Sequence, residues 1–470
     1  MPLLSGLQFC FRTNETSGNR VDSVAGLQLA PTGTIGSAAG KFGNAVDIGG
    51  GTSRLAQTVS STLTAGTGAF TVMCWVRYDT LSTSYPVARW DGIGDWLFFV
   101  SGTGRAGFEI RHNNDSTNTS AQTPSGAIIT GEWYMLIGWF DPSVGANGTA
   151  YVQLNNGTVY SAALTLPKNN PANLLMSVGV INPTAGVFGS TDGRVDQVCK
   201  WNRVLTADER AELWNNGDGK AFPFVTGIGG EVGWWCPSLD DAGNGTTNLL
   251  DLSGVNNNRG TLTNMDAATD WVADTDSGGV RALDFDGIND YGEISSSFVL
   301  TGAFSISWWE NLNAVNSFHA VASIKTSASS SSFIIYRSTN SSYQFLTWRN
   351  TTSSPQSAFR ASNASNLSMG SWRHFCITGI NLASSMIGDF QAYENGVPLI
   401  VTTAGNFVAS TFVNSIARDG LGTFNNAKFD DIRIFNRVLT TSEVQALASK
   451  RGYQPTPNTR RRRYSGSYGL

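Results

Sequence analysis

Two stretches of this 470-residue chain are nearly the same. Residues 201–206 read Trp-Asn-Arg-Val-Leu-Thr and residues 435–440 read Phe-Asn-Arg-Val-Leu-Thr, an offset of 234 residues (435 − 201). Each stretch follows an acidic segment that alternates in polarity, residues 193–198 in the first case and residues 428–434 in the second. This shared stretch, which we call the closing phrase, therefore marks the end of a unit that occurs twice.

Further landmarks recur in the same order on both sides of the chain. Residues 41–47 resemble 280–287, residues 70–75 resemble 304–309, residues 131–133 resemble 370–372, and residues 151–157 resemble 390–396. A chain of this length is too long for one ordinary core. We predict two domains, residues 1–225 and 226–454, followed by a basic C-terminal tail, residues 455–470.

The landmarks alternate with the period of a half-buried strand. Phe70, Val72, Cys74, Val76 and Tyr78 share one face of such a strand, and Thr71, Met73, Trp75 and Arg77 share the other. Asn-Gly pairs at 156–157 and 395–396 favour tight hairpin turns. Thr206 with Glu209, and Thr440 with Glu443, form capping boxes that predict one short helix at the end of each unit. The predicted fold class is all-β, with two tandem antiparallel β-sandwich (jelly-roll) domains, each ending in a short helix.

Composition narrows the classes of function. Charged residues make up 14% of the chain and the net charge is −4, so we expect no general attraction to nucleic acid. No apolar run approaches 18 residues, which predicts no membrane insertion, and the N-terminus shows no recognisable signal peptide. The five cysteines lack the spacing of a disulfide framework or a zinc site, so we interpret all of them as buried free thiols.

These landmarks resemble the laminin-G-like, concanavalin-A-like jelly-roll family. The resemblance rests on the Lys-Phe-Gly-Asn-Ala stretch at 41–45, the Phe-x-hydrophobic-x-x-Trp strands, the Gly-x-Trp strands and the closing phrase. It covers residues 5–220 and 231–450. His374 stands in the family's Trp-x-His position, whereas Met135 stands there in the first unit. The resemblance implies a non-catalytic module for carbohydrate binding, adhesion or assembly.

The sequence nominates no catalytic residues. Glycan hydrolases on this fold need two carboxylates across a cleft, and no Glu-x-Asp-x-x-Glu run is present. A nucleophile elbow, a zinc-protease motif and a phosphate loop are also missing from the sequence. We predict that the protein is not an enzyme.

Aromatic residues are the usual platform for a sugar, because its apolar face stacks on an indole while carboxylates bind the hydroxyls. Trp75 and Trp309 would lie on the strand face opposite Phe70 and Phe304. The segment Trp90-Asp91-Gly92-Ile93-Gly94-Asp95-Trp96 combines two indoles with two carboxylates. The candidate glycan-binding residues are Trp75, Trp90, Asp91, Asp95, Trp96 and Trp309; the alternative for each tryptophan is a place in the core.

Calcium is the metal that would suit the chain, since it takes oxygen ligands from loops rich in Asp and Asn. The candidate ligands are Asp47, Asp196, Asp284 and Asp430, which occupy equivalent places in the two units. The alternative is that these carboxylates accept hydrogen bonds from turns or pair with Arg203 and Arg437. No cofactor is required by the sequence.

The tail contains a basic run, Arg460, Arg461, Arg462 and Arg463, followed by Tyr464. Such a run is either a solvated end or a docking segment for an acidic partner. We interpret it as an assembly tail that attaches the protein to other subunits.

The leading hypothesis is a non-enzymatic structural or decoration protein of an extracellular assembly, a bacteriophage virion surface protein with a glycan-binding (adhesion) role. Its partners would be other subunits of the virion or surface assembly, and glycans. Its location would be the virion surface or the extracellular space. The alternative is a secreted bacterial lectin or adhesin, and a glycan hydrolase is the third possibility.

Overall fold

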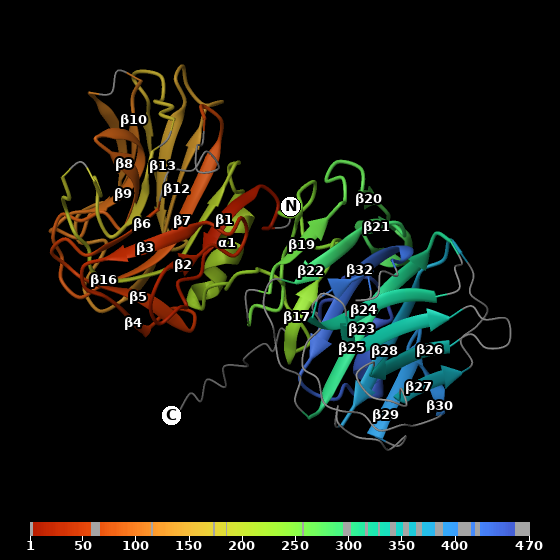
Figure 1. The fold of residues 1–470 in the computed structure, drawn as a ribbon. Helices are drawn as coiled ribbons and strands as arrows, with labels where there is room; N and C mark the ends of the chain where they lie inside the picture. The colour runs from red at the N-terminus through yellow and green to blue at the C-terminus, as the bar shows by residue number, and fades with distance from the viewer. Residues whose placement is uncertain are drawn as a thin grey trace, which may run out of the picture. The chain divides into compact units, whose positions relative to one another are not determined.

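Figure 1 shows a computed structural model of the chain. It describes residues 3–57, 66–113, 116–172, 174–184, 186–255, 258–294, 302–314, 369–380, 389–402, 415–418 and 424–455, together with the strand backbones at 318–327, 330–338, 345–350 and 357–362. The predicted assembly tail, Arg460–Arg463 and Tyr464, lies outside the described residues.

The first module is built from two antiparallel sheets of eight strands each. The sheet that we call the front sheet runs in the order β14 (Val159–Ala163), β13 (Thr149–Leu154), β12 (Trp133–Asp141), β7 (Phe70–Tyr78), β16 (Asp192–Trp201), β5 (Asn44–Gly49) and β4 (Ile35–Ala39), with β1 (Leu7–Phe11) also paired to β16. The back sheet runs β11 (Asn118–Gln122), β10 (Ala106–Arg111), β9 (Ile93–Val100), β8 (Val87–Asp91), β15 (Met176–Val178), β6 (Arg54–Gln57), β3 (Gln28–Thr32) and β2 (Arg20–Val21).

The second module repeats both orders strand for strand. Its front strands are β30 (Val397–Thr402), β29 (Phe390–Glu394), β28 (Arg373–Gly379), β23 (Phe304–Leu312), β32 (Asn426–Phe435), β21 (Arg281–Asp286) and β20 (Trp271–Ala273), with β17 (Glu231–Trp235) paired to β32. Its back strands are β27 (Ser357–Ser362), β26 (Phe345–Asn350), β25 (Ser330–Ser338), β24 (Phe318–Ser327), β31 (Ser415–Ile416), β22 (Tyr291–Ile294), β19 (Gly260–Thr263) and β18 (Asn248–Leu249). Pairing of β27 with β30 joins the two sets into one sheet. The predicted all-β, duplicated jelly-roll class is confirmed.

The core of the first module lies between its two sheets. From β7, the five residues predicted to share one face, Phe70, Val72, Cys74, Val76 and Tyr78, are fully buried there. Phe98 and Phe108 meet this set from the back sheet. Strand alternation thus places one face of β7 in the core, as the sequence predicts.

A short helix ends each module, α1 (Ala207–Trp214) and α2 (Thr441–Leu447), and both predicted capping boxes are present. Two 3-10 turns, η2 (Asn215–Gly217) and η3 (Asp276–Gly278), complete the helical structure of the described residues. The same hydrogen bond holds the closing phrase to the sheet in both modules. The Thr71 hydroxyl donates to the Arg203 carbonyl, and the Ser305 hydroxyl donates to the Arg437 carbonyl. None of the described helices has the length and apolarity to cross a membrane.

The cysteine prediction needs a correction. Cys10 on β1 and Cys199 on β16 are directly opposite each other in the antiparallel register, and a disulfide joins them across 189 residues of sequence. Cys74, Cys236 and Cys376 are free and buried, as predicted. Sequence spacing missed the bond because only the strand register brings the two positions together.

By compactness the chain divides into two units. The first contains Met1–Phe224 with Leu239–Thr269 and Ile294–Ser296, and the second contains the remainder. The main break falls between Phe224 and Val225, next to the predicted boundary after residue 225. The segment Leu239–Thr269 groups with the first unit, which the predicted boundaries do not anticipate.

Candidate functional site

Trp75 and Trp309 lie on the outer face of the front strands, as predicted, but the terminal helices cover them. Trp75 is 0% exposed and stacks on Trp214 of α1, with ring centroids 5.7 Å apart. Trp309 is 4% exposed, and its indole N–H donates to the carbonyl of Leu447 at the end of α2. Neither indole face is open to a sugar, because both anchor a helix to the sheet.

The segment from Trp90 to Trp96 is a hairpin of β8 and β9 rather than a loop, with Gly92 at a positive φ in the turn. Trp96 points into the sandwich and is 0% exposed, near Phe70 and Phe108. Asp95 is equally buried and forms ion pairs with Arg89 and Lys168. The prediction that Trp96 and Asp95 contact a glycan is therefore wrong for this structure.

Trp90 instead belongs to a group of rings on the outer face of the back sheet. This group, which we call the aromatic patch, consists of Tyr85, Trp90, Phe99 and Phe188. A Cβ added at Gly94 would meet the Trp90 ring at 2.6 Å, and Cβ atoms at Gly107 and Gly189 would clash with the rings of Phe99 and Tyr85. Each of the three rings thus occupies the space beside a glycine that a side chain at that position would fill.

The rings differ in how much of them reaches solvent. Trp90 is 7% exposed, because the Arg111 guanidinium lies over its face at 4.9 Å. Tyr85 and Phe99 are half-buried, and Phe188, whose ring centroid is 6.0 Å from that of Tyr85, is 59% exposed. Phe188 and its neighbours therefore present an aromatic surface, while Trp90 forms its base.

Polar groups border the aromatic patch. Asp91 accepts hydrogen bonds from the backbone N–H and the hydroxyl of Thr184, and Gly92 donates to Asn182, so the hairpin tip holds the loop that carries Phe188. Glu109 is half-buried on β10, and burial raises its pKa while Arg111 opposes the rise. Burial and then the charge of Glu109 raise the pKa of Tyr85. A carboxyl, a guanidinium and a phenol thus surround apolar rings.

The sequence nominates Trp90 and Asp91 as candidate glycan-binding residues, but not their neighbours Tyr85, Phe99, Phe188, Glu109 and Arg111. The pairing of Phe99 with Gly107 across β9 and β10 is visible only in the register. The Phe188-Gly189 dipeptide, an aromatic residue next to a glycine in a polar stretch, is the one local signal that the sequence offered.

The candidate metal ligands do not converge. Asp196 and Asp430 are 0% exposed at equivalent places in β16 and β32. Asp196 accepts from the Phe42 N–H and the Thr13 hydroxyl, and burial raises its pKa to about 7. Asp430 accepts from the N–H and hydroxyl of Ser238 and pairs with Arg451 at 3.4 Å. Burial raises the Asp430 pKa to about 6.

Asp47 and Asp284 also occupy equivalent positions in the two modules. Asp47 lies opposite Arg194 on the neighbouring strand, and Asp284 lies opposite Lys428. Asp47 approaches Arg194 at 3.8 Å, and Asp284 accepts from the Asn313 amide. No group of three His, Cys, Asp or Glu residues poised for a metal occurs within the described ranges. The expected alternative partners, Arg203 and Arg437, instead pair with the capping-box residues Glu209 and Glu443.

Comparison with protein families identifies the class. The laminin G family profile described as the "Concanavalin A-like lectin/glucanases superfamily" matches residues 49–209 and 286–445, one match in each module. The matched residues cover about two thirds of the chain. The chain belongs to this family, and two tandem copies are present. Among curated proteins, none matches the sequence.

Solved structures with similar folds include two from named organisms. One is domain 4 of the extracellular arabinanase AbnA from Geobacillus stearothermophilus in complex with arabinotriose (18% identity, 44% of this chain, 98% of that chain, TM-score 0.33). Another is a heptameric SAP-like pentraxin from Limulus polyphemus (16% identity, 35% and 80%, TM-score 0.29). The binding domain of botulinum neurotoxin DC in complex with SialylT covers 95% of this chain and 98% of its own, at 9% identity and TM-score 0.37.

Proposed function

We propose that this chain is a non-enzymatic surface protein that binds a glycan through the aromatic patch of its first module and serves as an adhesion or decoration subunit of an extracellular assembly, a bacteriophage virion. The single observation that carries the glycan part is the set of glycine-backed rings with Phe188 exposed at its edge. An isolated exposed phenylalanine is common on protein surfaces, whereas several rings packed together beside a carboxyl and a guanidinium combine the apolar and polar groups that bind sugars.

The carboxyls beside the aromatic patch favour binding over hydrolysis. A glycan hydrolase needs one carboxyl as acid and a second as base or nucleophile. The carboxyls at the patch are Glu109 and Asp91, and both oxygens of Asp91 accept hydrogen bonds from Thr184. Asp91 therefore supports the loop that carries Phe188, which leaves Glu109 as an acceptor for sugar hydroxyls.

A glycan array tests the proposal. The purified chain is expected to bind a defined subset of glycans, and Phe188→Ala is expected to weaken that binding about 2- to 10-fold, the effect of losing one stacking ring. Ile129→Ala is the matched control, since Ile129 is also a large exposed apolar residue (55%) of the first module. An array without signal, or equal losses in both variants, would contradict the proposal.

Incubation of bound glycans with the protein separates a lectin from a hydrolase. The proposal expects intact glycan by mass spectrometry after prolonged incubation with both the native chain and Glu109→Gln. Turnover that disappears in Glu109→Gln would establish a glycan hydrolase instead.

The assembly part has its own test. Cells that produce the protein are expected to release it in the particle fraction of a density gradient, where it co-sediments with other virion subunits. Free protein in the supernatant would favour the alternative, a secreted lectin or adhesin. The Cys10–Cys199 disulfide is the observation that favours this alternative, because disulfides persist in oxidising compartments outside the cytosol.

A further inference from the structure

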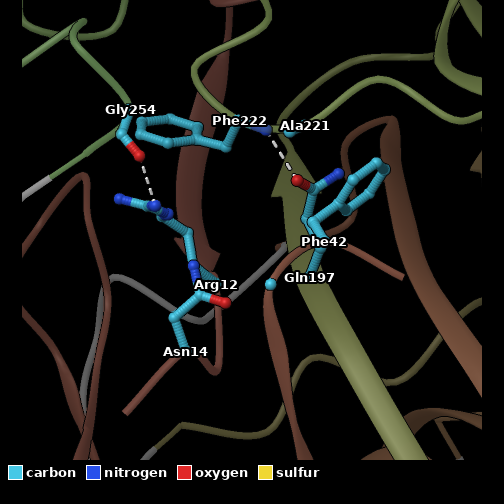
Figure 2. Close-up of a pocket in the computed structure, with 8 residues that line it drawn as sticks. Arg12, Asn14, Phe42, Gln197, Ala221, Phe222 and Gly254 are labelled. Atoms are coloured by element: carbon cyan, nitrogen blue, oxygen red, sulfur yellow. Dashed lines mark hydrogen bonds between the residues drawn. The ribbon is translucent and has the colours of Figure 1, made fainter. Parts of the chain in front are cut away.

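A pocket of about 260 Å³ lies in the first unit. Its lining residues are Arg12, Asn14, Phe42, Gly43, Gln197, Ala221, Phe222 and Gly254. None of them belongs to the aromatic patch, so the pocket is a separate site. Figure 2 shows Arg12 reaching Gly254 on one side and Gln197 accepting the Phe222 N–H on the other.

The side-chain acceptors in the polar lining already accept hydrogen bonds, whereas N–H donors of Arg12 remain for a ligand. Gln197 Oε1 accepts from the Phe222 N–H at 2.6 Å, and Asn14 Oδ1 accepts from the Asn44 N–H at 3.1 Å. Arg12 donates through one terminal nitrogen to the Gly254 carbonyl, which holds the guanidinium at the pocket wall. A guanidinium has five N–H donors in a planar fork, so most of its donor capacity remains for a ligand. The complementary ligand is rich in acceptors.

Two fixed rings form apolar walls. Phe42 packs edge-on against Trp75 with ring centroids 5.9 Å apart, and Phe222 is 4% exposed and packs edge-on against Phe224 at 5.6 Å. Each ring is held from behind by another ring, so its position does not depend on a ligand. The pocket therefore suits a flat apolar body that ends in a group of acceptors.

The charges around Arg12 limit how negative that ligand can be. Asp251, Glu15 and Asp196 are the carboxyls that act on the guanidinium. Asp251 accepts from the N–H groups of Ser253 and Asn258, and Glu15 accepts from the Val21 N–H. Burial raises the pKa of Asp196 to about 7, so this carboxyl is only partly charged near neutral pH. The remaining negative charge opposes a dianion such as phosphate more strongly than a monoanion.

We propose that this pocket binds a small monocarboxylate with a flat apolar body, whose carboxylate pairs with Arg12 and whose body lies between Phe42 and Phe222. An arginine fork matches the two oxygens of a carboxylate, and a charge-assisted pair is about twice as strong as a neutral one. The proposal does not depend on the glycan proposal, since the two sites share no residue.

Isothermal titration with benzoate and benzamide tests the ligand class. The two probes share a flat ring and differ in the charge of the acceptor group. Benzoate is expected to bind saturably. Benzamide is expected to bind with an affinity lower by about 10-fold or more. Arg12→Gln is expected to lower benzoate affinity about 10-fold, whereas Arg105→Gln, at an exposed arginine that bonds Gln122, is expected to leave it unchanged. Equal binding of the two probes would overturn the ligand class.

A second variant keeps the test decisive if Arg12→Gln destabilises the fold. Ala221 is an exposed lining residue, so Ala221→Trp is expected to fill the pocket without disturbing the core, and to abolish benzoate binding with the unfolding temperature unchanged. The absence of saturable binding to the native chain, or undiminished binding to both Arg12→Gln and Ala221→Trp, would overturn the proposal.

Discussion

Gln197 and Asp431 occupy the same bulge in the two modules, 234 residues apart (431 − 197). Both have a positive φ, 42° and 49°, at the point where β16 and β32 shift register against their neighbours. The Gln197 side chain accepts the Phe222 N–H, and the Asp431 side chain accepts the Gly452 N–H. Each bulge thus aims one polar side chain at the segment that follows the terminal helix and ties it to the sheet.

Gln197→Ala is expected to lower the free energy of unfolding by about 1–3 kcal/mol, because the buried Phe222 N–H and Lys220 carbonyl lose their partner. Urea denaturation monitored by tryptophan fluorescence measures the change. Gln122→Ala is the control, since its exposed side chain bonds only to the Arg105 side chain among the described contacts. A loss no larger than that of the control would contradict the role of the bulge.

Glu443 provides a prediction on acid stability. Its carboxylate accepts two bonds from Arg437, at 2.9 and 2.8 Å, and one from the Thr440 N–H. These bonds, those of Arg437 foremost, lower its pKa to about 2 from an ordinary 4.5. Because the folded-state pKa lies below the unfolded value, the stabilisation is complete above pH 4.5 and is lost as the pH falls towards 2.

Glu443→Gln is therefore expected to cost about 1 kcal/mol at pH 7, after allowance for the partial exposure of the pair, and almost nothing at pH 2. Unfolding free energies of the two proteins across this range measure the difference. Glu132→Gln, at an exposed position of the first module, serves as the control. A difference independent of pH would show that the carboxylate charge is not what stabilises the helix start.

The sequence predicts the parts of this protein that depend on local spacing. The 234-residue repeat, the two faces of β7 and both capping boxes all follow from sequence spacing, and the structure has each of them. The errors concern positions that tertiary contacts decide. Trp75 lies on the outer face as alternation requires, yet α1 packs over it. Neither the strand pattern nor the helix pattern predicts where a helix docks on the sheet. Phe99 becomes a surface ring because Gly107 is its neighbour across the strands, which only the register reveals.

The disulfide is a prediction that direct chemistry can check. Alkylation of the chain under denaturing conditions without reductant is expected to label three cysteines, Cys74, Cys236 and Cys376, and reduction is expected to expose Cys10 and Cys199 as well. Peptide mass spectrometry distinguishes the five positions. Protein from purified particles and protein from a culture supernatant provide matched samples. Five labelled cysteines before reduction would restore the original interpretation of all five as free thiols.

A buried lysine yields the last prediction. Lys200 is 0% exposed, donates to the Gln8 amide oxygen, and lies near Asp95, Arg89 and Lys168, so three cations share one carboxylate. Burial lowers its pKa to about 7 from 10.5. Because this folded-state pKa is lower than the unfolded value, the unfolded chain binds the proton more tightly between pH 10.5 and 7, and folding loses stability as the pH falls through that window.

Lys200→Met keeps the apolar stem and removes the charge, so it is expected to raise the free energy of unfolding by roughly 2–4 kcal/mol below pH 7, and by progressively less towards pH 10.5. Denaturant unfolding at pH 6, 8 and 10 measures this trend. Lys220→Met is the matched control, because Lys220 pairs with Glu212 at the surface and its loss changes stability by at most about 1 kcal/mol. Removal of the Lys200 charge stabilises the folded state only if Asp95 pairs with Arg89 and Lys168 and not with Lys200. A variant less stable than the native chain at pH 6 would therefore show that Lys200 also pairs productively with Asp95, and that the buried cluster is stabilised by all four charges together.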